Sequence, residues 1–154
     1  MRINHVCVMV SDLDKSFKFY RDILGFTNVM YDVTEPGALF SSDILDDVLG
    51  EKHASTRIIM VASDDGTLLE LQQASRPFTK KTPDEYLRYG GTGITELAFD
   101  VDDIDDFFEK VKAAAIETQT DYVWSPDPRV KSFLFYDPDG ALIQIIGLTA
   151  SAAA

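Results

Sequence analysis

An internal repeat constrains the fold of this 154-residue chain more than any other feature of its sequence. The segment HVCVMVSDLD, from His5, aligns without a gap with ELAFDVDDID, from Glu96. A second segment, DGTLLEL from Asp65, aligns with DGALIQI from Asp139. The two matches occur in the same order along the chain, and they join segments with the same expected secondary structure. The sequence therefore predicts a duplicated unit.

The two matches have different spacings, 91 residues for the first and 74 for the second. The first copy therefore holds about 17 additional residues, which we place within Ala38–Thr56. We expect a single domain over residues 1–150, with one repeat at about 1–75, a linker at 74–92, a second repeat at about 93–147 and a tail at 151–154. The predicted fold class is α+β, with two tandem βαβββ repeats that form a cupped eight-stranded mixed sheet.

Each copy has its own sequence of expected elements. The first copy predicts a helix that begins at Ser11–Asp12 and closes at Gly25, and an inserted helix at 41–49 that Gly50 ends. Its expected strands are 3–10, 26–33, 57–62 and 67–73. The second copy predicts a helix capped by Asp102 or Asp103. Its expected strands are 94–101, 118–124, 132–136 and 141–146.

Composition limits the partners and the location of the protein. The formal net charge of −12 argues against nucleic acid, whose phosphates require a basic surface. No run of 18 apolar residues is present, so we expect no membrane span. The N-terminal residues make a poor secretory signal. The lone Cys7 excludes an internal disulfide and suits a reducing compartment. We therefore expect a cytoplasmic protein.

Four polar residues interrupt apolar strands at positions that the repeat relates in pairs: His5 with Glu96, and Glu70 with Gln144. Side chains alternate across a strand, so each of the four shares one face with its second neighbours. A strand interior disfavours Glu and Gln unless they have a partner or a wet surface. One imidazole, two carboxylates and one amide oxygen suit a divalent metal such as Mn²⁺, Fe²⁺, Co²⁺, Ni²⁺ or Zn²⁺. The sequence thus predicts one metal site made of these four residues.

Simpler interpretations stand beside this prediction. A single His in a strand is commonly a hydrogen-bonded structural residue, and Glu70 and Gln144 could lie on a solvated sheet face. Five aromatic residues of the second repeat could line a substrate pocket, although core packing is the commoner role: Tyr122, Trp124, Phe133, Phe135 and Tyr136. Arg129 and Lys131 could meet an anionic substrate or be ordinary surface charges. Cys7 shares a face with His5, but no nucleophilic triad is visible.

The motifs together identify a resemblance that covers about residues 2–147. The strand ending in VSDLD and the helix after it, the segment GITELAFDV from Gly93, and YDPDGALIQ from Tyr136 resemble the vicinal oxygen chelate superfamily. Members include glyoxalase I, methylmalonyl-CoA epimerase, extradiol dioxygenases, fosfomycin-modifying enzymes and metal-free bleomycin-resistance proteins. The family's metal positions fall on His5, Glu70, Glu96 and Gln144. Two of them depart from its usual pattern: Glu96 replaces a His, and Gln144 replaces a Glu.

The resemblance implies a metal-dependent lyase or isomerase that binds a small oxygen-rich substrate through adjacent oxygens. A nearby carboxylate, Glu96 or Glu70, would transfer a proton, because Gln144 cannot ionise. Two alternatives stay open: an extradiol-type dioxygenase, against which Glu96 counts because that class uses two His and one carboxylate, and a metal-free binding protein for small molecules. Since the family often builds its cup from two chains, we also expect a homodimer.

Overall fold

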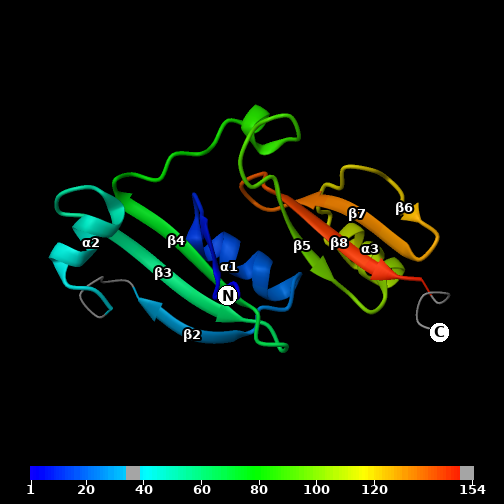
Figure 1. Ribbon diagram of the computed structural model, residues 1–154, viewed down its shortest axis with the longest axis horizontal. Helices are drawn as coiled ribbons and strands as arrows, with labels where there is room; N and C mark the ends of the chain where they lie inside the picture. The colour runs from blue at the N-terminus through cyan, green and yellow to red at the C-terminus, as the bar shows by residue number, and fades with distance from the viewer. Residues whose placement is uncertain (34–38, 150–154) are drawn as a thin grey trace. The chain divides into compact units, whose positions relative to one another are not determined.

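The computed structural model describes residues 1–33 and 39–149. The chain falls into two compact units, Met1–Lys81 and Thr82–Ala154, and the division lies inside the segment predicted as the linker. Each unit contains one four-stranded mixed sheet (Figure 1). No helix in the described parts of the chain is long and apolar enough to cross a membrane.

In its described residues, 1–33 and 39–81, the first unit has the element order β1-α1-β2-α2-β3-β4. The strands pair in the order β1-β4-β3-β2, and only β1 and β4 are parallel. Their bounds are β1 Val6–Met9, α1 Leu13–Asp22, β2 Asn28–Val33, α2 Ser42–Leu49, β3 Ser55–Ala62 and β4 Leu68–Arg76.

The second unit repeats this plan without the inserted helix. Its strands pair in the order β5-β8-β7-β6, and again only the first and last strands, β5 and β8, are parallel. Its elements are a short 3₁₀ helix η2 Asp84–Leu87, β5 Glu96–Asp100, α3 Ile104–Ala113, β6 Trp124–Asp127, β7 Val130–Tyr136 and β8 Leu142–Leu148.

The strand registers confirm the duplication that the sequence predicts. Cys7 lies beside Glu70, and their repeat equivalents, Ala98 and Gln144, lie beside each other in the second sheet. The β3–β4 and β7–β8 turns close with equivalent backbone bonds, from Ser63 N to the Thr67 carbonyl at 3.1 Å and from Asp137 N to the Ala141 carbonyl at 3.0 Å. Two βαβββ repeats are therefore present. The eight-stranded cup depends on how the two sheets are placed and stays a prediction.

The helix caps also follow the predicted residues. Asp12 accepts a hydrogen bond from Lys15 N at 3.0 Å, and Asp103 accepts the equivalent bond from Asp106 N at 3.0 Å. The inserted helix α2 starts after the cap Ser41 and ends at Gly50, whose φ of 67° is a left-handed conformation that glycine adopts at little cost. Ala38, the predicted start of the insertion, lies outside the described residues.

One face of each sheet is apolar and packs against a helix. In the first unit α1 packs on β4, where Leu69 and Leu71 are buried. In the second unit Phe108 of α3 meets Phe133 of β7 edge to face, with ring centroids 4.9 Å apart. Glu70 and Gln144 have the opposite parity from these buried neighbours, so they belong to the other face of their sheets. We call this second face of each sheet the open face.

The predicted strand at 118–124 is wrong. Thr118 forms an isolated bridge with Phe135, and the chain then leaves the sheet; Thr120 Oγ1 donates to the Tyr122 carbonyl at 2.8 Å. Pairing resumes only in β6, where Trp124 lies beside Ser132. The local side-chain bond of Thr120 competes with the ladder, as Thr and Asn side chains do in turns. β6 contains Pro126, which is tolerated because β6 is an edge strand.

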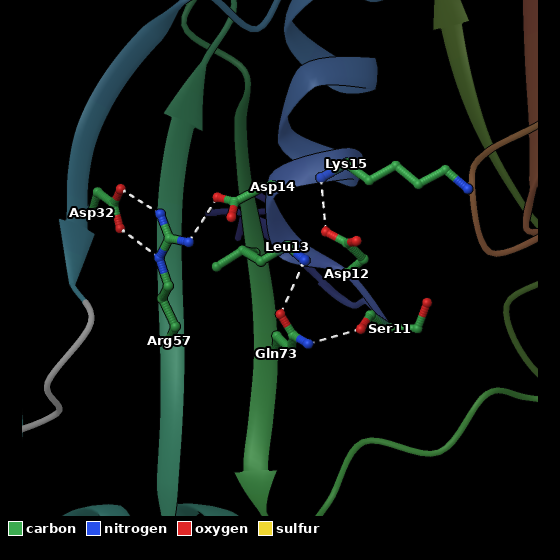
Figure 2. Close-up of polar contacts among 8 residues, drawn as sticks. All are labelled: Ser11, Asp12, Leu13, Asp14, Lys15, Asp32, Arg57 and Gln73. Atoms are coloured by element: carbon green, nitrogen blue, oxygen red, sulfur yellow. Dashed lines mark hydrogen bonds and ion pairs between the residues drawn. The ribbon is translucent and has the colours of Figure 1, made fainter.

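Polar contacts at the helix-covered side of the first unit join β2, β3, β4 and α1 (Figure 2). Arg57 of β3 contacts Asp32 of β2 at 2.9 Å and Asp14 of α1 at 2.7 Å. Gln73 of β4 accepts from Leu13 N at 3.0 Å and donates to the Ser11 carbonyl at 2.7 Å, so its amide fixes the connection from β1 into α1.

We predict that Gln73→Leu lowers the free energy of unfolding by about 1–2 kcal/mol, because it removes both bonds at the start of α1 while keeping the side-chain volume. Urea unfolding measures the change. Lys18→Ala, an exposed change in the same helix, is the control and should stay within about 0.5 kcal/mol of the wild type. Equal stabilities of the two variants would contradict this role of Gln73.

Candidate functional site

A row of chemically active side chains crosses the open face of the first sheet. Cys7 of β1 lies beside Glu70 of β4, which lies beside Met60 of β3, which lies beside Tyr31 of β2. His5 precedes β1 by one residue and has the parity of Cys7, so it belongs to the same face. A thiol, a carboxylate, a thioether and a phenol therefore share one line across four strands.

His5 and Glu70 form the closest predicted pair. His5 Nε2 lies 4.0 Å from Glu70 Oε2, and the two side chains are 36% and 15% exposed. His5 Nδ1 lies 2.7 Å from the amide oxygen of Asn4. Because an amide oxygen can only accept, Nδ1 carries a proton, and in the neutral form of the imidazole the lone pair is on Nε2, on the side of Glu70. Metal-binding histidines have this arrangement, with one nitrogen held by an outer partner and the other free to ligate.

Glu70 has two further neighbours that keep their protons. Desolvation of the thiol, followed by the charge of nearby Glu70, raises the pKa of Cys7 to about 12, although the residue as a whole is exposed. The thiol donates to Gln72 Oε1 at 3.5 Å. Desolvation, followed by Glu70, also raises the pKa of Tyr31. Both groups are therefore neutral donors at neutral pH. Cys7 is a poor nucleophile in this state, as the lack of a triad predicts.

In the second unit, Glu96 and Gln144 share the open face of their sheet. Gln144 lies beside Ala98 in the register, and Glu96 lies beside Leu142. The hydroxyl of Tyr89 donates a short hydrogen bond to Glu96 Oε2. This bond, followed by desolvation, raises the pKa of Tyr89 to about 12, so the phenol keeps its proton and Glu96 accepts.

A hydrogen-bond chain fixes the orientation of the Gln144 amide. Ser132 Oγ donates its single proton to the Ile145 carbonyl at 2.7 Å. It can therefore only accept from Gln144, whose Nε2 lies 3.0 Å away. This turns the amide oxygen of Gln144, the atom that could ligate a metal, away from Ser132.

Each unit thus brings one predicted pair onto one face. Within residues 1–33 and 39–149, no three His, Cys, Asp or Glu side chains form a group that could hold a metal ion. The complete set of His5, Glu70, Glu96 and Gln144 draws on both units and stays a prediction.

The remaining predicted residues separate into core and surface. Phe133 and Phe135 are fully buried on the helix-covered face, so they are core residues. Arg129 pairs with Asp127 at 2.9 Å, and Lys131 pairs with Asp105 at 2.5 Å, which makes both of them partnered surface charges. Tyr122 is exposed, and Tyr136 lies on the open face.

Sequence reasoning missed Tyr31 and Tyr89, the two phenols beside the candidate carboxylates. Tyr31 reaches the open face through an irregularity in the β2–β3 register between Val29 and Tyr31. No turn residue in the sequence marks this bulge. Tyr89 lies in the segment predicted as linker, where no periodicity assigns a face. Only its closeness to Glu96, seven residues further on, could have drawn attention to it.

We predict that Glu70→Gln makes Cys7 more reactive. Removing the negative charge lowers the pKa of the thiol, so the thiolate fraction at a given pH rises about tenfold for each unit of pKa. The rate of alkylation by iodoacetamide, measured against pH on the single cysteine, reports the shift. Asp64→Asn, an exposed change in the β3–β4 turn, is the control. Identical profiles for Glu70→Gln and wild type would contradict the closeness of Cys7 and Glu70.

Comparison with known proteins agrees with this geometry. The model of the Glyoxalase/Bleomycin resistance protein/Dioxygenase superfamily matches residues 2–145. A search of the curated proteins found no significant match. A glyoxalase family protein from Bacillus cereus is similar in structure, with a TM-score of 0.78 and 20% identity, over 97% of this chain and 95% of that one.

Two other solved structures are similar over nearly the whole chain. The fosfomycin resistance protein FosX from Listeria monocytogenes, solved with Mn(II) and sulfate, has a TM-score of 0.60 and 16% identity, over 99% of this chain and 96% of that one. A glyoxalase/dioxygenase from Nostoc punctiforme has a TM-score of 0.61 and 25% identity, over 96% and 91%. With two βαβββ repeats and a family match over most of its length, the chain belongs to the Glyoxalase/Bleomycin resistance protein/Dioxygenase superfamily.

Proposed function

We propose that the chain is a metal-dependent enzyme whose metal ligands are His5, Glu70, Glu96 and Gln144. The observation that carries the proposal is the His5–Glu70 pair. The imidazole Nε2 lies 4.0 Å from a carboxylate oxygen, and Asn4 holds the other ring nitrogen. A divalent ion between the imidazole and the carboxylate would replace their weak mutual contact with two metal–ligand bonds of about 2.0–2.2 Å, one to each group.

The donor chemistry fits the proposed metal. One nitrogen and three oxygen donors suit Mn²⁺, Fe²⁺, Co²⁺, Ni²⁺ or Zn²⁺. The amide nitrogen of Gln144 is engaged by Ser132, which leaves its oxygen as the donor atom. FosX was solved with Mn(II), so Mn²⁺ is the first metal to test. When bound, the metal would act as a Lewis acid on adjacent oxygens of a small substrate.

The reaction we propose is a lyase or isomerase reaction in which Glu96 moves the proton and Glu70 stays a fixed ligand. Glu70 lies in the middle of β4, between β1 and β3, and its side chain is only 15% exposed. Glu96 is the first residue of β5, at the end of an edge strand, where a side chain has more room to move. The Tyr89 phenol, which keeps its proton, orients the Glu96 carboxylate.

A second candidate is a metal-free protein that binds small molecules. The observation that favours it is that Glu96 and Gln144 already have hydrogen-bond partners, Tyr89 and Ser132, without a metal. An extradiol-type dioxygenase is less favoured because it needs a second His. The only other one, His53, lies between α2 and β3, outside the open face. We further propose that the protein works as a homodimer in the cytoplasm.

We predict that His5→Ala weakens Mn²⁺ binding by at least about 100-fold. Loss of even an outer-shell partner costs 10- to 100-fold, and His5 is proposed as a direct ligand. Isothermal titration of chelator-treated protein measures the affinity. The matched control is His53→Asn, because asparagine tolerates the φ of 60° at that position. Equal Mn²⁺ affinity of His5→Ala and wild type would remove the proposed site.

We predict that Glu96→Gln keeps the metal but loses at least about 100-fold in turnover, whereas Glu70→Gln, a change at the proposed fixed ligand, keeps most of its turnover per bound metal ion. An amide can still ligate through oxygen but cannot accept a proton at neutral pH. The metal content of each variant measures the first effect. Turnover rates with a panel of compounds that includes glyoxalase substrates and fosfomycin measure the second. Full activity of Glu96→Gln would return Glu96 to a binding role. A wild type that binds these compounds without turnover would favour the metal-free alternative.

A further inference from the structure

Arg88 is held against the open face of the second sheet by three contacts. Its guanidinium lies over the ring of Tyr136, with the Cζ atom 4.3 Å from the ring centroid. Its Nη1 donates to the Gly140 carbonyl at 3.0 Å and to the Leu87 carbonyl at 3.1 Å. The side chain is therefore fixed, and one nitrogen is committed to the protein.

The ring beneath Arg88 lies in the same cross-strand row as Glu96. Tyr136 of β7 lies beside Leu142 of β8, which lies beside Glu96 of β5. Two strand spacings separate Tyr136 from Glu96, about 10 Å. The next residue after Arg88, Tyr89, donates to Glu96. Consecutive residues of one segment thus contact both ends of this row, and a small molecule could reach from the guanidinium to the Glu96 carboxylate.

The positive charge of Arg88 has no carboxylate partner among the described residues. Four of the six arginines do have one: Arg21 with Asp22, Arg57 with Asp14 and Asp32, Arg76 with Glu51, and Arg129 with Asp127. Arg2, near the N-terminus, is exposed. In a chain with a net charge of −12, the half-buried Arg88 is thus held by a ring and two carbonyls.

The unused edge of the guanidinium has the geometry that oxyanions require. The Tyr136 ring covers a face of the group, and Nη1 is engaged, which leaves Nε and Nη2 as two parallel donors. This pair of donors binds a carboxylate or phosphate through two oxygens. A clamp for the β7–β8 turn would not need the charge, because the turn is already closed by the bonds of Asp137 with Gly140 and Ala141.

We infer that Arg88 binds an anionic group of the substrate, a carboxylate or a phosphate-type oxyanion, and so restricts the enzyme to small anionic oxygen-rich molecules. Its meaning for catalysis rests on the proposed function, but the anion site itself needs no metal. The two ideas can therefore fail separately. If the protein bound anions but not Mn²⁺, only the proposed metal-dependent function would be contradicted.

The test uses the full chain treated with a chelator, because paramagnetic Mn²⁺ would broaden the NMR signals, and inorganic phosphate and acetate as probes. Each anion is titrated into the protein while the arginine Nε–H signals are followed by ¹⁵N NMR. We expect one saturable site. The signal of Arg88, which Arg88→Lys assigns by its loss, should move most. Arg88→Gln should weaken binding of the preferred probe by at least about tenfold, and Arg88→Lys by less, because the charge remains but the fork is lost. Arg129→Gln should leave the affinity unchanged.

Several outcomes would overturn the inference. They are the absence of saturable binding of either anion to the wild type, an affinity within twofold of wild type in Arg88→Gln, or a shift confined to another arginine. A preference for phosphate over acetate would identify a tetrahedral oxyanion as the recognised group, and the reverse a carboxylate. If Arg88→Gln unfolds at a lower temperature than wild type, Arg88→Lys provides the comparison. That variant must then still lose affinity for the inference to stand.

Discussion

The parallel pairing of the first and last strand of each repeat is the constraint on which the candidate site depends. The ladders continue past the strands with equivalent bonds, from Val10 N to the Gln72 carbonyl and from Val101 N to the Ile146 carbonyl, both at 2.9 Å. Each pairing places residues far apart in the sequence side by side. The helix that follows β1 or β5 covers one face of the sheet, so polar residues of the opposite parity can lie only on the open face. The site is thus a consequence of the βαβββ topology.

A polar residue in an apolar strand needs a partner, because an unsatisfied buried group costs about 1–3 kcal/mol. Three of the four candidate residues have one from their own unit: Asn4 for His5, Tyr89 for Glu96 and Ser132 for Gln144. These partners engage one atom of the side chain and leave another atom available, such as Nε2 of His5 and the amide oxygen of Gln144. Networks that satisfy one end of a ligand and orient the other are typical of metal sites. The same contacts would also serve a metal-free binding face, which is why metal binding decides between the two functions.

The sequence predicts the features that depend on local chemistry and on strand parity. The caps at Asp12 and Asp103, the inserted helix that Gly50 ends, and the open-face positions of Glu70 and Gln144 are all confirmed. Features that depend on tertiary contacts could not be predicted. The sequence predicts a strand at 118–124, yet a local turn displaces the strand to β6. Arg88 and Tyr89 lie in a segment without periodicity, so nothing in the sequence assigns them to a face.

We propose that two pairs of residues, one pair from each repeat, hold a single metal ion. A crystal structure of the protein with Mn²⁺, analysed by anomalous diffraction, tests it most directly. We expect one manganese position, with His5 Nε2 and oxygens of Glu70, Glu96 and Gln144 at about 2.0–2.3 Å. A manganese ion bound by residues of one unit alone, or no ordered manganese at saturating concentration, would contradict it.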